Sequence, residues 1–289
     1  MTVNNSNLDF KIKDFAKKFD RSRKRKIPYI SQRNPRLSSG IFCLWDDGYI
    51  WEWPKLNWKR NKMAKEKTRR ECIDIDGNSY KTVKLGDQIW MAENLKVAHY
   101  RDGTIIPTGL SSGEDGEWSN TNQGAYCNYD DNKDNVEIYG RLYNWYAAYE
   151  PRGLAPEGWH MPSKEEWKKL IDYLDGNDVA GAKMKEIGTE HWKKPIKPVK
   201  SFLPSTNESG FTTIAAGKRS PVNGLYYDIG LNAYFWCADI EDDGVLWYLH
   251  LSNATIDVNI LESKIIRMTW DGKRIRMKNN GYSVRCLKD

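Results

Sequence analysis

The sequence predicts an α+β fold with a mixed, largely antiparallel sheet and two or three helices, preceded by a basic N-terminal arm. Strand and helix patterns come in blocks rather than in alternation along residues 71–289 of the 289-residue chain. Residues 1–70 contain 19 Lys and Arg against 7 Asp and Glu, a net charge of +12, which leaves −6 for residues 71–289. This asymmetry indicates an attachment arm at 1–70 and a mildly acidic globular part at 71–289.

Composition narrows the class of protein further. The 13 Trp and 16 Tyr outnumber the 7 Phe, and rings with a polar edge suit binding faces as well as cores. No apolar run approaches the roughly 18 residues of a membrane span, and no apolar leader opens the chain. We therefore expect a virion or cytoplasmic assembly as the location, with the cell surface as the alternative if a leader has been removed.

The arm begins with a helical pattern over residues 7–26. Its apolar residues recur at helical steps and place one face together: Leu8, Ile12, Phe15 and Phe19. A basic cluster follows them: Arg21, Arg23, Lys24, Arg25 and Lys26. Such a helix docks on a membrane, a nucleic acid or an acidic protein surface, or packs on its own globular part with the basic face in solvent.

An aromatic hairpin is expected next in the arm. Residues 27–40 read as an extended linker, and Asp47-Gly48 is a turn signal between two aromatic-rich runs. Trp51 and Trp53 should pack against a partner, because an isolated hairpin is only marginally stable. Residues 55–70 are basic again.

The globular part opens with strands and ends with strands. Residues 71–98 predict three strands separated by turns at Asp76-Gly77 and Gly86-Asp87. A loop-rich stretch covers 100–136, and a helix is expected over 139–149, ended by Pro151. Beyond residue 200 the pattern returns to short strands.

A second helix is marked more strongly. Ser163 and Glu166 have the spacing of a capping box, and Gly176 is a suitable stop. The apolar stripe that follows has helical spacing: Trp167, Leu170, Ile171 and Leu174. A further short helix is expected over 178–187.

Several stretches in order resemble one family. They are DIDGNSYKTVKLGDQIWMAENL (74–95), GAYCNYDD (124–131), YGRLYNWYAA (139–148), GWHMPSKEEW (158–167), LIDYLDG (170–176), TNESGF (206–211) and GYSVRCLKD (281–289). Together they resemble the Fibrobacter succinogenes major paralogous domain over residues 73–289. The resemblance implies a C-type-lectin-like fold, distantly similar to formylglycine-generating enzymes. It also implies that the protein comes from Bacteroidetes or their relatives, in which this family is found.

The resemblance also assigns roles within the GWHMPSKEEW stretch. It implies that Trp159 and Trp167 hold the helix against the core and that His160 is a helix-entry residue. Family members carry cysteine where this chain has Ala155, and that cysteine would pair with the counterpart of Cys286. We therefore expect the family disulfide to be absent, in keeping with a chain that folds without an oxidising compartment.

Enzyme chemistry is not expected. Cys43, Cys72, Cys127, Cys237 and Cys286 form no CxxC pair, and the four histidines form no i, i+4 pair. The resemblance to formylglycine-generating enzymes would ask for two cysteines on one copper ion, with Cys237 and Cys286 the nearest candidates. Their sequence contexts do not match that site, so an oxidase is the weakest alternative.

No cofactor is expected, with calcium as the one alternative. Asp130, Asp131 and Asp134 lie in an acidic loop whose oxygen ligands could hold Ca²⁺, although the loop lacks the glycine and the terminal glutamate of an EF-hand. The acidic run of Asp239, Glu241, Asp242 and Asp243 is expected to be a solvated turn.

The expected binding surface is aromatic. Six Trp and Tyr residues fall in the region that forms the ligand face of C-type-lectin-like proteins, where they could stack on a glycan or a host-surface ligand: Tyr226, Tyr227, Tyr234, Trp236, Trp247 and Tyr248. Core packing is the alternative for each of them.

These features predict a non-enzymatic structural and recognition protein. The first hypothesis is a phage virion component, namely a capsid decoration protein, a head fibre or a tail receptor-binding part, whose arm docks on other structural proteins. A bacterial surface lectin or adhesin is the second hypothesis. Nucleic-acid binding through the arm, where tryptophans alternate with Lys and Arg, is the third.

Overall fold

The computed structural model describes residues 42–44, 50–52, 70–195, 205–240, 245–264, 266–268, 272 and 274–289. The chain divides into two compact units, Met1–Lys65 and Glu66–Asp289. In the first unit, strand β1 (Phe42–Leu44) pairs antiparallel with β2 (Ile50–Glu52), which confirms the expected hairpin. The remaining arm predictions, the helix at 7–26 with its basic cluster and the packing of the Trp51 and Trp53 side chains, lie outside the described residues.

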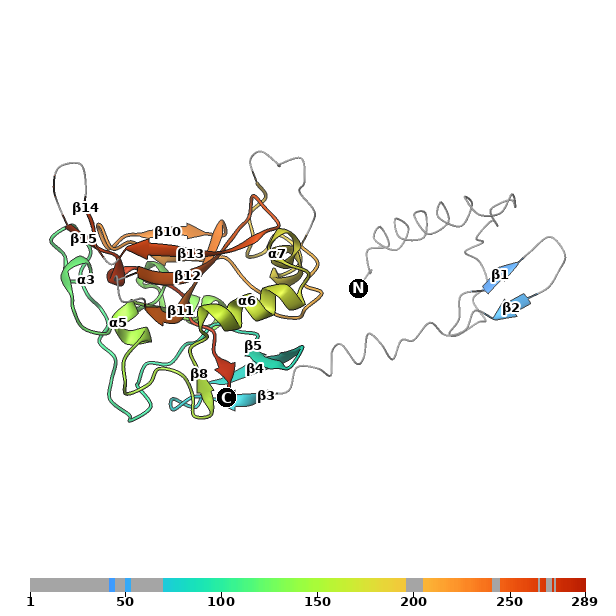
Figure 1. The fold of residues 1–289 in the computed structure, drawn as a ribbon, viewed down its shortest axis with the longest axis horizontal. Coiled ribbons are helices and arrows are strands. Elements are labelled where there is room, and N and C mark those ends of the chain that lie inside the picture. Colours follow the sequence, from blue (N-terminus) through green and yellow to red (C-terminus); the bar gives the residue numbers. More distant parts are fainter. Residues whose placement is uncertain are drawn as a thin grey trace. The chain divides into compact units, whose positions relative to one another are not determined.

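The second unit contains two five-stranded sheets (Figure 1). The first sheet has the order β3-β4-β5-β16-β8 and is antiparallel throughout. Its strands are β3 (Arg70–Ile73), β4 (Ser79–Leu85), β5 (Gln88–Met91), β8 (Trp159–His160) and β16 (Leu287–Lys288). The three strands expected within 71–98 are confirmed, and the end of the chain inserts between β5 and β8.

The second sheet has the order β10-β9-β11-β12-β13. Its strands are β9 (Ala216–Arg219), β10 (Tyr226–Ile229), β11 (Asn232–Ile240), β12 (Val245–Ser252) and β13 (Val258–Lys264). Only β9 and β11 run parallel, and the other pairs are antiparallel. Two small hairpins complete the strands, β6 (Tyr126–Cys127) with β7 (Leu142–Tyr143) and β14 (Ile266–Met268) with β15 (Arg274–Arg276). The α+β class with a largely antiparallel sheet is therefore confirmed.

Two helices of more than one turn accompany the sheets in the described part of the second unit. Helix α6 (Lys164–Tyr173) begins with the expected capping box, in which Ser163 and Glu166 bond each other's backbone N–H groups, and α7 (Asn177–Met184) follows. The shorter helical turns are α3 (Glu117–Asn120), α4 (Val136–Tyr139), α5 (Trp145–Ala148), η1 (Tyr129–Asp131), η2 (Lys133–Asn135) and η3 (Met277–Asn279).

The single helix expected over 139–149 is wrong. Strand β7 separates α4 from α5, and Gly140 ends α4 with φ +70. A Cβ at position 140 would lie 2.8 Å from the carbonyl oxygen of Leu95, so only glycine permits this close approach. Asn144 then starts α5 by accepting the N–H of Ala147. The aromatic residues of this segment repeat at helical steps, and tertiary packing overrides that pattern.

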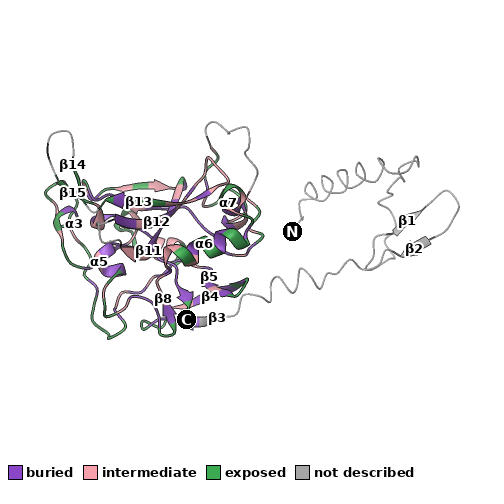
Figure 2. Ribbon diagram, viewed as in Figure 1, coloured by how far each residue is buried: buried purple, intermediate pink, exposed green. Residues whose placement is uncertain are grey.

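Helix α6 lies between the two sheets, and its inner face is buried (Figures 1 and 2). The ring of Trp167 is centred 4.5 Å from Trp90 of β5 and 5.9 Å from Phe235 of β11. Phe211 closes the cluster with its ring 6.0 Å from Trp167. The resemblance-based role of Trp167 is thus confirmed, and a single side chain joins α6 to both sheets.

A second apolar cluster surrounds the site of the family disulfide. Ala155, Trp159, Cys72 and Cys286 are all buried in it. Cys72, Cys127, Cys237 and Cys286 are free thiols, and burial raises the pKa of Cys72 and of Cys127 to about 12. In place of a bridge, Ala155 is held by side-chain packing and by its carbonyl, which accepts a 3.0 Å hydrogen bond from Arg101 Nη2.

His160 ties the capping box to the end of the chain. Its Nε2 lies 2.9 Å from Glu166 Oε1 and its Nδ1 lies 2.6 Å from Asp289 Oδ1. Partial burial would lower the pKa of His160, but the hydrogen bonds to Asp289 and Glu166 outweigh it and raise the pKa above its ordinary value.

A pH-dependent contribution to stability follows from this pair of contacts. Because the folded-state pKa is raised, the contribution is complete below about pH 6.5 and is lost as the pH rises through the folded pKa. We expect His160→Gln to lower the free energy of unfolding more at pH 5.5 than at pH 8.5, by no more than about 1 kcal/mol, since the contacts are partly exposed. Thermal denaturation at the two pH values measures this, and an equal loss at both would contradict it.

Candidate ligand-binding site

An open hollow of about 660 Å³ lies on one face of the second sheet. It is bounded by β9 and β10, by β12 and β13, and by the β14–β15 hairpin with η3. Four tyrosines line it, together with one histidine: Tyr227, Tyr234, Tyr248, Tyr282 and His250. The structure therefore brings three of the six expected binding aromatics, Tyr227, Tyr234 and Tyr248, into one site.

The register of β11 and β12 explains the aromatic floor. Tyr234 lies opposite His250 in the antiparallel pair, and the two rings stack with centroids 5.0 Å apart. Tyr282 stacks on Tyr234 at 5.0 Å and 12°, and Tyr248 lies 5.2 Å from Tyr282. Tyr234 and Tyr282 also belong to an apolar core cluster, so the floor of the hollow is continuous with the core.

Two charged side chains hold Tyr234, which forms part of the floor of the hollow, in place. Tyr234 donates a 2.7 Å hydrogen bond to Asp228 Oδ2, which also lies 3.3 Å from Lys218 Nζ. The ammonium of Lys218 lies 4.9 Å from the centre of the Tyr234 ring. Burial and the bond to Asp228 raise the pKa of Tyr234, so its hydroxyl stays protonated and oriented at neutral pH.

Two polar groups of the hollow point to a ligand with hydrogen-bonding groups. Burial and then the Lys218 cation lower the pKa of His250, so its ring is neutral at pH 7 and carries one donor and one acceptor. Its Nε2 lies 3.1 Å from Asn232 Oδ1. Ser263 is 5% exposed, and its Oγ has no hydrogen-bond partner among the residues that the structure describes.

The lining carries a small positive charge. Lys218 and Arg267 are cationic, Asp228 is anionic, and His250 is neutral, which gives a net charge of +1. Arg267 is exposed on β14, and within the described ranges it has no carboxylate at ion-pair distance. Tyr227, 41% exposed, offers an accessible ring at the rim, and its hydroxyl accepts a 2.9 Å hydrogen bond from Asn223.

Three of the expected binding aromatics do not reach this hollow. Trp236 is only 1% exposed and donates its indole N–H to the carbonyl of Tyr143, so it is a core residue. Trp247 lies on the opposite face of β12, against the cluster that contains α6, with Lys164 Nζ 3.8 Å from its ring centre. Tyr226 packs on Tyr129 beside a third apolar cluster. Alternation along β10 and β12 separates Tyr226 from Tyr227 and Trp247 from Tyr248, whereas Trp236 shares the face of Tyr234 but lies where the core covers it.

The acidic loop considered for the calcium alternative folds into short helical turns. Asp130, Asp131 and Asp134 occupy two consecutive helical turns, η1 and η2, and Asp131 accepts a 2.7 Å hydrogen bond from the hydroxyl of Tyr226. Across the described residues, no group of three His, Cys, Asp or Glu side chains converges as metal ligands would.

The acidic run 239–243 is described only in part. Asp239 accepts the backbone N–H of Lys164 at the start of α6, so for Asp239 the expectation of a solvated turn is wrong. Glu241, Asp242 and Asp243 lie outside the described residues. The Asp239 carboxylate stabilises the positive, N-terminal end of the α6 dipole.

The two cysteines of the oxidase alternative are placed apart. Cys237 belongs to the apolar cluster around α6, and Cys286 belongs to the cluster with Ala155 and Trp159. Burial raises the pKa of both thiols.

Some residues of the hollow were missed from the sequence. His250 and Tyr248 alternate on one strand, and this spacing could have placed His250 beside Tyr234 once the pairing was known. Tyr282 stands in the GYSVRC stretch, in which the resemblance implies a role only for Cys286. Ser263 and Arg267 carried no local signal, because their role depends on how the hairpin folds over the sheet.

Comparison with known proteins gives one match. The model of the Fibrobacter succinogenes major domain matches residues 83–288, about 71% of the chain. No curated protein and no solved structure matches this chain. Within the described ranges, no helix combines the length and the apolar composition that a bilayer crossing requires.

Proposed function

Since this chain belongs to the family of the Fibrobacter succinogenes major domain over residues 83–288, we propose that its globular part is a non-enzymatic recognition module that binds a saccharide carrying an acidic group. The proposed binding site is the hollow on the second sheet, named here the tyrosine hollow after Tyr227, Tyr234, Tyr248 and Tyr282 in its lining. A C-type-lectin-like arrangement of the sheets is part of the same proposal, because the sequence resemblance implies it.

The observation that carries the proposal is the convergence of aromatic rings with polar groups in one open hollow. Tyr227 at the rim presents a ring face on which the apolar face of a sugar ring can stack. His250 and Ser263 supply hydrogen-bonding atoms deeper in the hollow. Arg267 gives a bidentate donor for a carboxylate, which is why the proposed ligand is acidic.

The basic arm completes the proposal as an attachment segment. Its net charge of +12 over residues 1–70 favours an acidic surface of a larger assembly, and a phage virion remains our first hypothesis for that assembly. The globular part would then be displayed for binding. A bacterial surface location is the alternative setting for the same recognition role.

Binding to the hollow can be tested on the full-length protein with methyl glucuronide as the acidic probe and methyl glucoside as its neutral counterpart. We expect the glucuronide to bind more tightly, and we expect Tyr227→Ala to weaken its binding about threefold to tenfold by removing the stacking ring. Arg267→Gln should reduce the preference for the acidic probe. Calorimetry or ligand-observed NMR measures each affinity.

The matched control is Tyr173→Ala, which removes an exposed tyrosine on α6, outside the hollow. It should leave both affinities unchanged. Equal binding of the glucuronide by the parent protein and by both hollow variants would refute the assignment of the site.

A further inference from the structure

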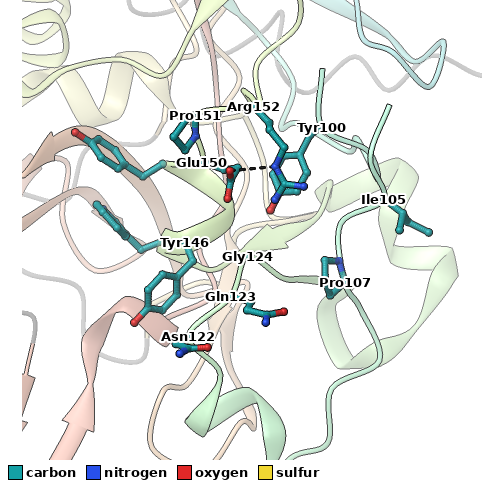
Figure 3. Close-up of a pocket in the computed structure, with 12 residues that line it drawn as sticks. Tyr100, Ile105, Pro107, Asn122, Gln123, Gly124, Tyr146, Glu150, Pro151 and Arg152 are labelled. Carbon is teal, nitrogen blue, oxygen red and sulfur yellow. Dashed lines mark hydrogen bonds and ion pairs between the residues drawn. The ribbon is translucent and has the colours of Figure 1, made fainter. Parts of the chain in front are cut away.

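A second hollow, of about 440 Å³, lies at a different place in the fold (Figure 3). It is formed by residues 100–107, by residues 122–124, and by α5 with the turn at 149–152. None of its lining residues belongs to the tyrosine hollow on the second sheet. The sequence patterns singled out no residue of this hollow as a ligand contact.

One wall of the second hollow is an aromatic stack. Trp145 and Tyr149 lie one turn apart along α5, and their rings stack with centroids 4.5 Å apart and an angle of 20°. Lys278 Nζ lies 4.1 Å from the centre of the Trp145 ring. Trp145 is therefore held between a cation and Tyr149, while Tyr149, 46% exposed, presents its ring to the hollow.

The lining of the hollow includes one buried polar group for which the described residues supply no partner. Tyr100 is 1% exposed, and its hydroxyl has no hydrogen-bond partner among the described residues. Burial raises the pKa of Tyr100 to about 12, so the hydroxyl keeps its proton at neutral pH and can both donate and accept. A buried hydroxyl without a partner is unfavourable, so a bound polar group at this place would stabilise it.

Gly124 makes room for that hydroxyl. A Cβ at position 124 would lie 2.0 Å from Tyr100 Oη, a distance that no side chain can accept. The φ of Gly124 is not in the left-handed region, so its backbone conformation does not require glycine. Glycine at this position leaves the space that the Tyr100 hydroxyl occupies beside the hollow.

The rim of the hollow is polar and electrically neutral. Glu150 and Arg152 form an ion pair with Oε1 and Nε 3.0 Å apart, and the guanidinium of Arg152 lies 4.2 Å from the centre of the Tyr100 ring (Figure 3). The carboxamides of Asn122 and Gln123 are on the opposite side of the lining. The charged groups cancel, and both donors and acceptors are available.

We infer that this hollow is a second binding site, which takes one sugar unit of a neutral saccharide. A stacking ring beside carboxamides, an ion pair and a hydroxyl matches the apolar face and the hydroxyl-rich edge of an uncharged sugar. A proline-rich peptide would use the aromatic wall but would leave the Tyr100 hydroxyl and the carboxamides unpaired. The cancelled charge separates this site from the tyrosine hollow, whose lining is positive.

The inference is tested on the full-length protein with methyl glucoside and methyl galactoside as neutral probes, by ligand-observed NMR. We expect at least one of the two to bind, and Tyr149→Ala to weaken that binding about threefold to tenfold, whereas Tyr149→Phe keeps the stacking ring and retains it. Gly124→Ala should also weaken it, because the added methyl displaces the Tyr100 hydroxyl. Tyr173→Ala, which removes an exposed tyrosine outside both hollows, is the matched control and should have no effect.

Each outcome either supports or overturns the second saccharide site. Loss of neutral-sugar binding in Tyr149→Ala but not in Tyr173→Ala supports the second site, whatever happens to the acidic probe. Binding of neither neutral sugar, or binding that depends on Tyr227 alone, overturns it. Binding of an oligoproline peptide that depends on Tyr149, without neutral-sugar binding, assigns the hollow to peptides and overturns the saccharide class.

Discussion

Arg285→Ala is expected to lower the free energy of unfolding by about 3–5 kcal/mol, which is a large share of the stability of a domain. Arg285 is 1% exposed, and its guanidinium donates to Asn94 Oδ1 and to the carbonyl of Thr212, each at 2.9 Å, and to the carbonyl of Phe211. Alanine would leave two buried acceptors and one partly buried acceptor without their donor, and each loss is unfavourable.

The size of this effect depends on what Arg285 joins. Asn94 also donates to the carbonyl of Tyr139 at 2.9 Å, so the arginine supports a link between the end of β5 and α4. The guanidinium lies 4.5 Å from the centre of the Phe211 ring, in the same cluster as Trp167. The variant would therefore loosen polar and apolar contacts together.

Urea denaturation followed by circular dichroism measures the change for Arg285→Ala. Arg285→Lys is the informative companion, because it keeps the charge and most of the stem but cannot reach three acceptors with one fork, so an intermediate loss is expected. Arg152→Ala, an exposed arginine, is the control and should change stability little. A loss below about 1 kcal/mol for Arg285→Ala would contradict the structural role.

Trp167→Ala is expected to cost about 3–5 kcal/mol through the cavity that it leaves. The side chain is fully buried and contacts Trp90, Phe211 and Phe235, which come from the segments that α6 joins. Those rings are held by neighbouring strands, so they cannot collapse far into the vacated space. Chemical denaturation with two-state fitting gives the value.

Trp167→Phe provides the matched comparison for the cavity argument. The indole Nε1 of Trp167 has no hydrogen-bond partner among the described residues, so its removal breaks no hydrogen bond there. The loss should then reflect only the smaller ring and stay near about 1–2 kcal/mol. A loss as large as that of the alanine variant would show that the indole N–H matters and that the cavity argument is incomplete.

The fold could be predicted from the sequence where an element depends only on residues close to one another in the chain. Ser163 and Glu166 mark the start of α6 through a reciprocal hydrogen bond that depends only on their spacing. The helix expected over 139–149 failed because Gly140 and β7 respond to contacts with residues near 95, about 45 positions earlier. Local periodicity carries no information about such contacts.

The candidate site could be predicted only in part, for a related reason. β11 is buried on both faces over residues 233–237, so alternation cannot reveal which side chains face the hollow. Tyr234 and Trp236 share one face of this strand, yet only Tyr234 lies where the surface opens. The position along the strand, rather than the side-chain type, decides between a ligand contact and a core contact.

Tyr234 and Tyr282 belong both to the core and to the floor of the tyrosine hollow. This double role limits how the proposed recognition could change over evolution. Substitutions beneath the hollow would threaten folding itself, whereas the turn at 220–223 and the β14–β15 hairpin can vary with little penalty. Related domains with the same core would then differ in ligand preference only through this turn and this hairpin. In the proposed recognition role, the aromatic floor is already ordered before binding, so little conformational entropy would be lost when a ligand binds.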